Sequence, residues 1–385
     1  MDASNEINHL LDGFASLSEQ SLAHLEQAKD AGVKVVGVYC IFSPLELIRA
    51  AGALPVGLCG KRQEPIAAAE AELPSNLCPL IKSSYGYALT DTCPFFTASD
   101  VVLGETTCDG KKKMYEALDQ IKPVHLMHLP YTPDLPHAQA YWRGELDRLV
   151  EFLEELTGRQ ITSQALRREI ALADRVRRLF KELHQANAAH PAPPISGRDM
   201  LPMLESKNFW PDLEDFARRL EELLAAVRQY TPPPDAPAPP RVLLTGTPIG
   251  KGSDKVLSLI EEAGAVVIAM ENCTGLKSLW SQVGSDSPDP MEALARRYLA
   301  LPCSCMTPNH RRRELLREMA GLYGVRGMVD QSWHACHTYI IESVPLGRHL
   351  EQELSLPVLR LCTDYSQSDL ETLRTRVEAF LEMMV

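Results

Sequence analysis

Residues 33–46, VKVVGVYCIFSPLE, indicate the fold class of this chain. The first part, VKVVGVYC, is a run of β-branched and other apolar residues, which is typical of a buried strand. Ser43, Pro44 and Glu46 then offer an N-cap, a proline at the first helical position and an acidic residue at the third, so we expect a helix directly after the strand. A strand followed at once by a helix is the βα unit of a parallel sheet.

Further apolar runs predict that the rest of the chain repeats this unit. Two of them extend the first sheet, with a helix from about Lys111 between them: 100–108 and 124–129. Four more alternate with helix-length stretches and are followed by a last helix over about 368–384: 241–246, 265–273, 324–331 and 357–362. This alternation favours a second doubly wound parallel sheet.

A proline-rich segment at 231–240, TPPPDAPAPP, divides the chain because it cannot form a helix and favours a stiff spacer. Before it, residues 137–230 show apolar residues at helical spacing, which predicts a helical lobe. We therefore expect an N-terminal α/β domain over 1–136, the helical lobe, the linker and a C-terminal α/β domain over 241–385. Two such domains would leave a cleft between them.

The composition excludes several classes of protein. A chain of 385 residues, 45% hydrophobic and 23% charged, can form two cores and is not disordered. Its 39 basic and 51 acidic residues give a net charge of −12, which disfavours binding to nucleic acid or to an anionic membrane. No apolar run approaches the roughly 18–20 residues of a membrane span, and residues 1–20 do not resemble a signal peptide, so we expect a cytoplasmic protein.

Ten cysteines are unusual in such a protein and need an explanation. Disulfides are not expected in a reducing compartment. No C-x-x-C pair occurs, which disfavours zinc knuckles and ferredoxin runs, so any metal ligands must converge from separate loops. Five cysteines end a predicted strand or follow it closely, at the sheet edge where binding crevices form: Cys40, Cys108, Cys273, Cys336 and Cys362.

Buried packing is the alternative role for each cysteine, because free cysteine behaves as a small hydrophobe. We favour packing for three of them: Cys59, Cys273 and Cys362. Most of the others lie beside proline, before Asp-Gly or in PCSCMTPN, where irregular backbone leaves N–H groups that can hydrogen-bond sulfur. For these, packing and ligation of a cluster both stay open: Cys40, Cys78, Cys93, Cys108, Cys303, Cys305 and Cys336.

The turn GTPIGKGSDK at 246–255 follows a predicted strand but lacks the spacing of a phosphate loop. A Walker A loop needs four residues between its first glycine and Gly-Lys-Ser/Thr, whereas three residues separate Gly246 from Gly250. The G-x-G-x-x-G pattern fails as well. We favour a tight βα turn, and we expect any ATP hydrolysis to take place on a partner.

Two kinds of polar residue are weaker candidates. His334 and His337 flank Cys336 and could ligate a metal or move protons, although most histidines are merely satisfied polar residues. Lys111 lies in a run of three lysines at a predicted helix start, where positive charge is unfavourable with the helix dipole. It could balance an anionic cluster or substrate, and a solvated face is the alternative.

Several stretches resemble a known family in the same order along nearly the whole chain: LCPLIKSSYGYALTDTCPFF, ETTCDGKKKMYEAL, PCSCMTPN, ACHTYIIES and TDYSQSD. The family is that of the 2-hydroxyacyl-CoA dehydratases and benzoyl-CoA reductases, and the resemblance is strongest to its double-cubane iron–sulfur cluster proteins. It implies two Rossmann- or flavodoxin-like domains around an iron–sulfur cleft and a homodimer. It also implies a separate activator ATPase with its own 4Fe-4S cluster, so that ATP acts only through this partner.

The resemblance also implies a ligand set. Cys78, Cys108 and Cys336 match the three ligands found across the family. Cys40, Cys93 and one of the pair Cys303 and Cys305, preferably Cys305, would hold a second cubane in a sulfide-bridged 8Fe-9S centre. The catalytic side chains are not implied beyond the cluster, with His337 and Lys111 as further candidates.

The function implied by this resemblance is that of an ATP-dependent, low-potential reductase component. It would receive electrons from the activator and reduce a small molecule. The alternative is a subunit of a 2-hydroxyacyl-CoA dehydratase, a lyase that eliminates water through a ketyl radical. An electron carrier without catalysis, and cysteines that only pack, are the remaining alternatives.

Overall fold

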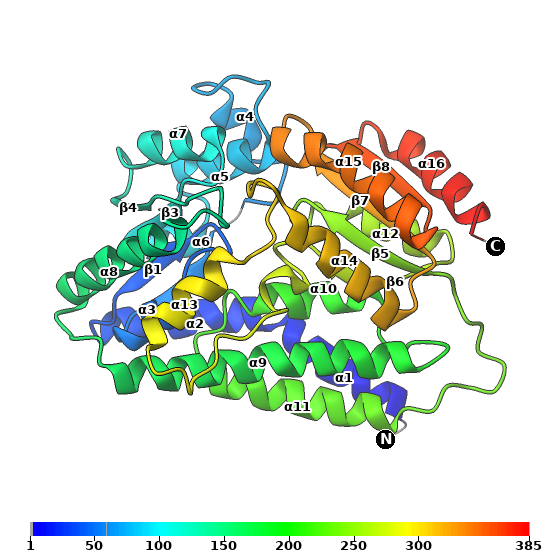
Figure 1. Cartoon of the computed structure of the whole chain (residues 1–385), viewed down its shortest axis with the longest axis horizontal. Helices are drawn as coiled ribbons and strands as arrows, with labels where there is room; N and C mark the ends of the chain where they lie inside the picture. Colours follow the sequence, from blue (N-terminus) through cyan, green and yellow to red (C-terminus); the bar gives the residue numbers. More distant parts are fainter. Residues whose placement is uncertain (1–2, 59, 385) are drawn as a thin grey trace.

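The computed structural model describes residues 3–58 and 60–384 and contains two parallel four-stranded sheets, which confirms the expected α/β class (Figure 1). The strand orders are β2-β1-β3-β4 and β6-β5-β7-β8. The first sheet consists of β1 (Val35–Val38), β2 (Leu54–Gly57), β3 (Val101–Glu105) and β4 (Val124–Met127). The second consists of β5 (Arg241–Gly246), β6 (Val266–Glu271), β7 (Gly327–Trp333) and β8 (Val358–Thr363).

The inner strands of both sheets are buried, except that Arg241 at the start of β5 is partly exposed. Every residue of β1, β3 and β7 is buried, as expected for apolar strands covered by helices on both faces. Strand β8 is an edge strand, and there Arg360 and Cys362 are exposed. Because all the strands of each sheet are parallel, their carboxyl ends lie at the same edge of that sheet.

Helices connect the strands and cover the sheets. Those beside the first sheet are α2 (Leu17–Asp30), α3 (Leu45–Ala50), α4 (Ile66–Ala69), α5 (Pro79–Thr90), α6 (Pro94–Ala98) and α7 (Asp109–Leu118). Those beside the second are α12 (Lys255–Glu262), η1 (Leu276–Ser278), α14 (His310–Tyr323), α15 (His337–Leu354) and α16 (Leu370–Glu382). The predicted last helix thus corresponds to α16.

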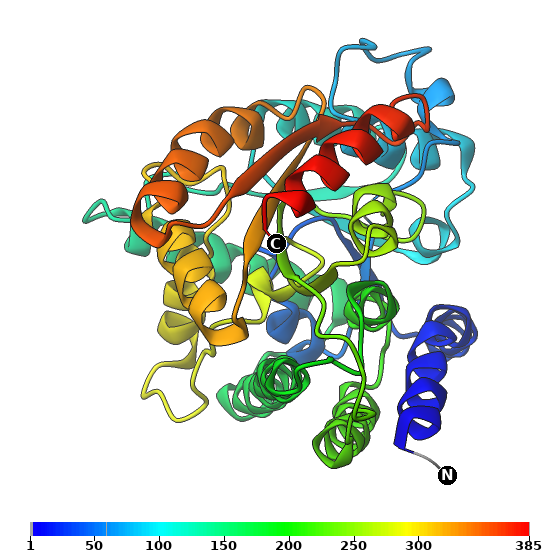
Figure 2. The same ribbon diagram turned by 90° about the vertical axis from the view of Figure 1, so that its right-hand side faces the viewer.

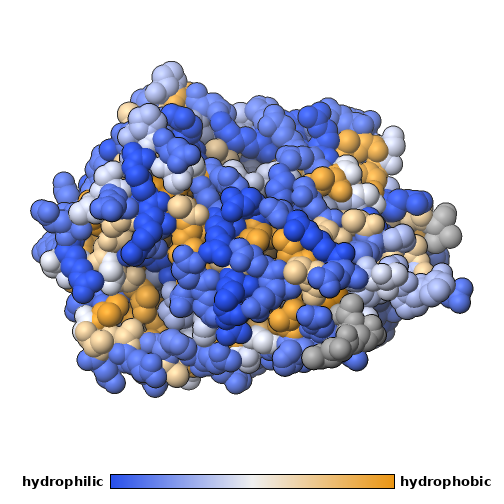
Figure 3. Space-filling model, turned by 90° about the horizontal axis from the view of Figure 1, so that it is seen from below, coloured by the Kyte–Doolittle hydropathy of each residue, from blue (hydrophilic) through white to orange (hydrophobic). Residues whose placement is uncertain are grey.

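Helices α1 (Ala3–Ala15), α9 (Ser163–Ala189) and α11 (Leu213–Gln229) form a layer along the bottom of the molecule in Figure 1 and are seen nearly end-on in Figure 2. Three further helices pack on this layer or on the sheets: α8 (Ala138–Thr157), which contacts β4; α10 (Gly197–Ser206), which contacts α1 and β6; and α13 (Pro290–Leu299), which contacts α8 and α9. Thr162, Ser196 and Asp212 cap α9, α10 and α11 by accepting a backbone N–H in the first turn. From below, this face is mostly hydrophilic with small apolar patches (Figure 3).

The helical layer packs against both halves of the molecule. Helix α10 contacts β6, α9 contacts both α3 and α14, and α1 contacts α10 and α11. One hydrophobic cluster accordingly contains Val102 of β3, Leu204 of α10 and Leu243 of β5. Apolar packing through the helices therefore joins the two sheets.

Two local features differ from the sequence-based expectation. Helix α3 begins at Leu45 without a side-chain cap, and the Ser43 hydroxyl instead donates to the buried carboxylate of Glu105. Strand β2 is not predicted at all. Residues 231–240 contain no helix or strand, as the prolines require. No helix within the described residues has the length and apolar character to cross a membrane.

Candidate functional site

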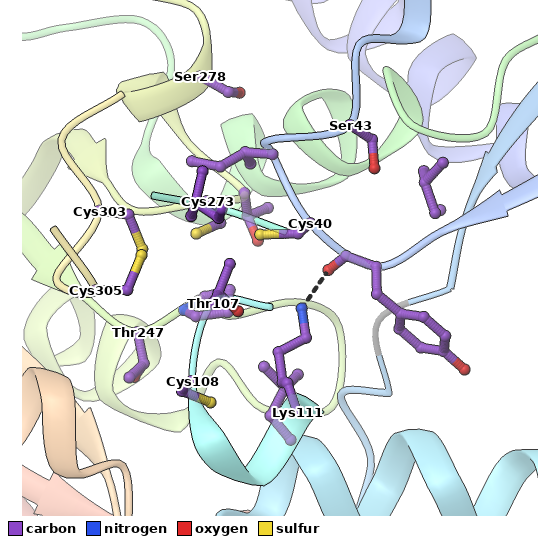
Figure 4. A pocket seen from close by; sticks show the side chains of 18 of the residues that line it. Cys40, Ser43, Thr107, Cys108, Lys111, Thr247, Cys273, Ser278, Cys303 and Cys305 are labelled. Atoms are coloured by element: carbon purple, nitrogen blue, oxygen red, sulfur yellow. Dashed lines mark hydrogen bonds between the residues drawn. The ribbon is translucent and has the colours of Figure 1, made fainter. Parts of the chain in front are cut away.

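A cavity of about 930 Å³ lies where loops of both sheets meet. Its wall includes residues of the loops after β1, β3, β6 and β7, together with parts of α3, α9 and α13. Seven cysteines line it, from both sides of the proline-rich segment: Cys40, Cys78, Cys108, Cys273, Cys303, Cys305 and Cys336. Figure 4 shows five of them around the same space.

The parallel topology explains why these cysteines converge. Cys40 lies two residues after β1, and Cys273 lies two residues after β6. Cys108 and Cys336 each follow a central strand and immediately precede a helix, α7 and α15. Since the carboxyl ends of parallel strands meet at one edge, each sheet presents its cysteines to the cavity.

Cys78, Cys108 and Cys336, which we call the first thiol group, each occupy the N-cap position of a helix. A hydrogen bond with Cys336 lowers the pKa of Cys78 against the effect of burial, and two backbone N–H groups of α5 add to this. The same hydrogen bond and burial raise the pKa of Cys336. Of the two, Cys78 is therefore the thiol that loses its proton more readily, and the thiolate is the form that binds metals.

Cys40, Cys273, Cys303 and Cys305, which we call the second thiol group, also line the cavity, and Figure 4 shows them together with Cys108 of the first group. A hydrogen bond with Cys305 lowers the pKa of Cys303 to about 6, assisted by the positive charge of Lys277. Burial raises the pKa of Cys40 well above its usual value, and the charges of Cys273 and Cys303 raise it further. These mutual effects show that the four thiols lie close together.

The donor set fits an iron–sulfur cluster better than a single metal ion. Within the part of the chain that the structure describes, no three His, Cys, Asp or Glu side chains are arranged to hold a metal ion. A cluster differs because its thiolates surround several irons rather than one point, and cysteine thiolates are its usual ligands. The seven thiols of this cavity provide that chemistry in two groups.

Positive side chains also line the cavity. Lys111 donates to the Tyr39 carbonyl oxygen at 3.3 Å (Figure 4), and its charge counteracts the rise that burial causes in the pKa of Cys40. Lys61 and Lys207 line the wall as well. Lys111 thus lies where a cation would balance thiolate charge, although the expectation for the lysine run also included a solvated face. Lys113 does lie in solvent, paired with a glutamate.

The two candidate histidines lie differently. His337 lines the cavity at the first position of α15. His334 is exposed, with its Nδ1 at 3.7 Å from the carboxylate of Asp364. The structure therefore brings His337, but not His334, to the thiols.

Cys93, a ligand expected from the sequence, is not among the residues that line the cavity. It precedes α6, which leads into the amino end of β3, so it lies at the opposite edge of the sheet from Cys108. Cys273, expected to pack in a core, does line the cavity. Its position after β6, which matches that of Cys40 after β1, is the signal that could have identified it.

The other two cysteines expected to pack have different outcomes. Cys362 is exposed on the edge strand β8, so the expectation of core packing is wrong for it. Cys59 lies outside the described residues.

Backbone N–H groups of the turn after β5 are hydrogen-bonded to other side chains of the protein. The Lys251 N–H donates to the Glu205 carboxylate at 3.0 Å, and the Gly250 N–H donates to the Ser253 hydroxyl at 3.1 Å. A phosphate loop needs such groups free for the ligand. Thr247 and Pro248 of this turn form part of the cavity wall instead.

Comparisons with known proteins agree with this arrangement. The family model of the 2-hydroxyglutaryl-CoA dehydratase D-component matches residues 40–384, a range that includes all seven cavity cysteines. The "Putative dehydratase subunit YjiM" of Escherichia coli (strain K12) is 43% identical over 385 residues, 100% of both chains. The (R)-phenyllactyl-CoA dehydratase beta subunit of Clostridium sporogenes is 21% identical over 94% of each chain. One of the benzoyl-CoA reductase subunits of Thauera aromatica is 25% identical over 70% of this chain and 69% of its own.

Proposed function

Because the chain belongs to the 2-hydroxyglutaryl-CoA dehydratase D-component family, we propose that it is an enzyme subunit that holds iron–sulfur clusters in the cavity between its sheets. The observation that carries the proposal is the convergence of seven thiols from both halves of the chain on one space of about 930 Å³. Packing alone does not require thiols from so many separate loops to face a cavity. When bound, such clusters accept and donate single electrons at low potential.

Two sets of ligands support a double-cubane centre. Cys78, Cys108 and Cys336 of the first thiol group would hold one cubane. Cys40, Cys273 and one of the Cys303–Cys305 pair would hold the second. The remaining thiol of that pair would donate its S–H to the ligating sulfur, as one thiol of the pair does to the other in the structure.

The rest of the wall would control charge and water around the centre. Lys61, Lys111 and Lys207 would offset the charge of the thiolates, which favours the more reduced and more negative state. Apolar residues such as Val38, Leu129 and Trp333 line the same cavity and limit the entry of water. We propose that the protein in this form is a reductase component, working as a homodimer with an activator ATPase that supplies electrons.

The names of the relatives favour a second candidate. Three of the proteins that match are beta subunits of dehydratases that act on 2-hydroxyacyl-CoA compounds. A dehydratase subunit would need only the first thiol group and one cluster with an iron open to the substrate hydroxyl. It would also work beside a different subunit rather than a second copy of itself.

Iron and acid-labile sulfide analysis of anaerobically purified protein separates the two candidates. A double cubane gives about eight irons per chain and a single cubane about four. The reduced, activated protein should then be assayed for loss of water from 2-hydroxyacyl-CoA, which the dehydratase candidate requires. A colourless protein without iron would contradict both.

A further inference from the structure

A buried network of charges lies next to the second thiol group. Lys277 of η1 has no exposed side-chain surface, and its Nζ lies 3.2 Å from the carboxylate of Glu271. Arg312 of α14 is equally buried and lies 3.3 Å from the same carboxylate. Arg312 also pairs with the Glu342 carboxylate and lies 3.9 Å from that of Asp330. The network therefore holds charges of both signs, and Lys277 is its cation beside Tyr339.

Tyr339 connects this network to the cavity. It lies on α15, three residues after Cys336, and lines the cavity although it is buried. Lys277 Nζ donates a hydrogen bond of 2.7 Å to its hydroxyl oxygen. Lys277 Nζ and the Arg312 guanidinium also lie 4.9 Å and 5.0 Å from the centre of its ring.

The hydroxyl hydrogen of Tyr339 has no acceptor among the described residues. Because its oxygen accepts from an ammonium group, that hydrogen must point toward something else. Burial and then the charges of Cys273 and Cys303 raise the pKa of Tyr339 well above its usual value, so the hydroxyl keeps its hydrogen. Cys273 and Cys303 line the same cavity, and sulfur held by them is the natural acceptor for this hydrogen.

Tyr298 shows the contrasting arrangement in the same cavity. It also lines the wall and is buried, but its hydroxyl donates to the Glu46 carboxylate at 2.7 Å. Its hydrogen is therefore already used within the protein. Of these two tyrosines, only Tyr339 has a hydroxyl hydrogen that can still form a hydrogen bond with a group bound in the cavity.

We propose that Tyr339 donates a hydrogen bond to the sulfur held by Cys273 and Cys303 and thereby raises the reduction potential of the cluster at the second thiol group. This inference rests on the proposed function. Hydrogen bonds and positive charge near cluster sulfur stabilise the reduced state, which carries one more negative charge. In the reduction no bond forms or breaks: the cluster gains one electron from the reductant, and the hydroxyl keeps its hydrogen. Tyr339 thus changes the reduction potential of the cluster without taking part in a bond-breaking step.

An anaerobic redox titration of the loaded protein, followed by electron paramagnetic resonance with dithionite as reductant, tests the proposal. Tyr339→Phe should shift one midpoint potential to a more negative value without loss of iron. Replacing Tyr339 by 3-fluorotyrosine, a stronger donor of similar size, should shift it to a more positive value. A structural role would not produce shifts of opposite sign.

Tyr298→Phe is the matched control, since it removes the same atom from the same cavity and should leave both potentials in place. A Tyr339→Phe protein with full iron and the wild-type potential overturns this inference alone. A 3-fluorotyrosine protein whose midpoint potential does not become more positive also overturns it. The 3-fluorotyrosine protein keeps the tyrosine side chain, so it can be measured even if the phenylalanine variant does not fold. Wild-type protein without iron would instead contradict the proposed function.

Discussion

The thiol groups of Cys78 and Cys336 share a hydrogen bond, although the first residue precedes α5 beside one sheet and the second precedes α15 beside the other. A thiol is a weak donor, so this contact alone adds little to stability. Shared iron would replace it by ligand bonds from both halves of the chain. A bound cluster should therefore strengthen the link between the halves beyond the apolar packing that already joins them.

We expect the iron-loaded protein to melt at a higher temperature than the iron-free protein, by at least about 5 °C. Metal binding to a site formed only on folding adds its free energy to stability, and each kcal/mol raises the melting temperature of domains of 150–250 residues by about 2–4 °C. Anaerobic calorimetry before and after chelation measures the difference. Cys362→Ser, at an exposed position, should preserve it, and equal melting of the two forms would contradict the idea.

Cys273→Ser should lower the iron content by about half, because one cubane of the proposed pair loses a ligand. Cys93→Ser should leave the iron content unchanged, because Cys93 lies at the opposite edge of its sheet. Both variants change a cysteine to serine, so each controls for the other, and the analysis needs only iron and protein assays. If Cys273→Ser keeps its full iron content and Cys93→Ser loses iron, this prediction is wrong and Cys93 is a ligand, as expected from the sequence.

The stability of the protein should fall as the pH drops from about 6.5 to about 4, in part because of His184. This side chain is fully buried, and burial lowers its pKa to about 4. The unfolded chain therefore binds a proton that the folded chain does not, and this contributes a loss of about 3 kcal/mol across that window. Urea unfolding at several pH values measures the free energy of unfolding as a function of pH. With His184→Gln, whose side chain does not titrate, this free energy should fall less between about pH 6.5 and about pH 4. Parallel profiles for the two proteins would contradict the assignment.

Gly246→Ala should destabilise the protein by more than about 2 kcal/mol. Gly246 ends β5 with φ of 114°, and an added Cβ would lie 1.9 Å from the Gln331 carbonyl oxygen. Gly144→Ala is the control, because this glycine lies in α8 with nothing within 4 Å of the added atom, and alanine should stabilise the helix by about 0.5–1 kcal/mol. Denaturant unfolding measures both, and equal effects at the two positions would argue against the close approach.

The strands that carry the cavity are predictable because their apolar runs are long and followed by helices. Residues 33–40 and 241–246 correspond to β1 and β5, and the alternation predicts that both sheets are parallel. Strand β2 is not predictable in the same way, because it has four residues, one of them proline, and is held by pairing with β1. Ser43 has the residue type of an N-cap, but a buried carboxylate 62 positions away competes for its hydroxyl.

The site shows where local patterns stop being informative. Cys93 and Cys78 both precede a proline that begins a helix, so their neighbours cannot distinguish them. What separates them is the edge of the sheet at which each helix begins, and that is a property of the whole topology. Cys362 ends a predicted strand, yet the sequence does not tell that β8 lies at the edge with this side chain in solvent.

The identical order of strands in the two sheets makes this chain a topological repeat within one polypeptide. Cys108 and Cys336 occupy equivalent places in it, each three residues after the third strand of its sheet and directly before the next helix. An assembly of two identical half-chains would have to present the same ligands and the same charges twice. Because both halves are covalently joined here, each can diverge, and Lys111 follows one of these cysteines by three residues where Tyr339 follows the other. A cluster bound as proposed would therefore have different side chains on the sides that face the two halves.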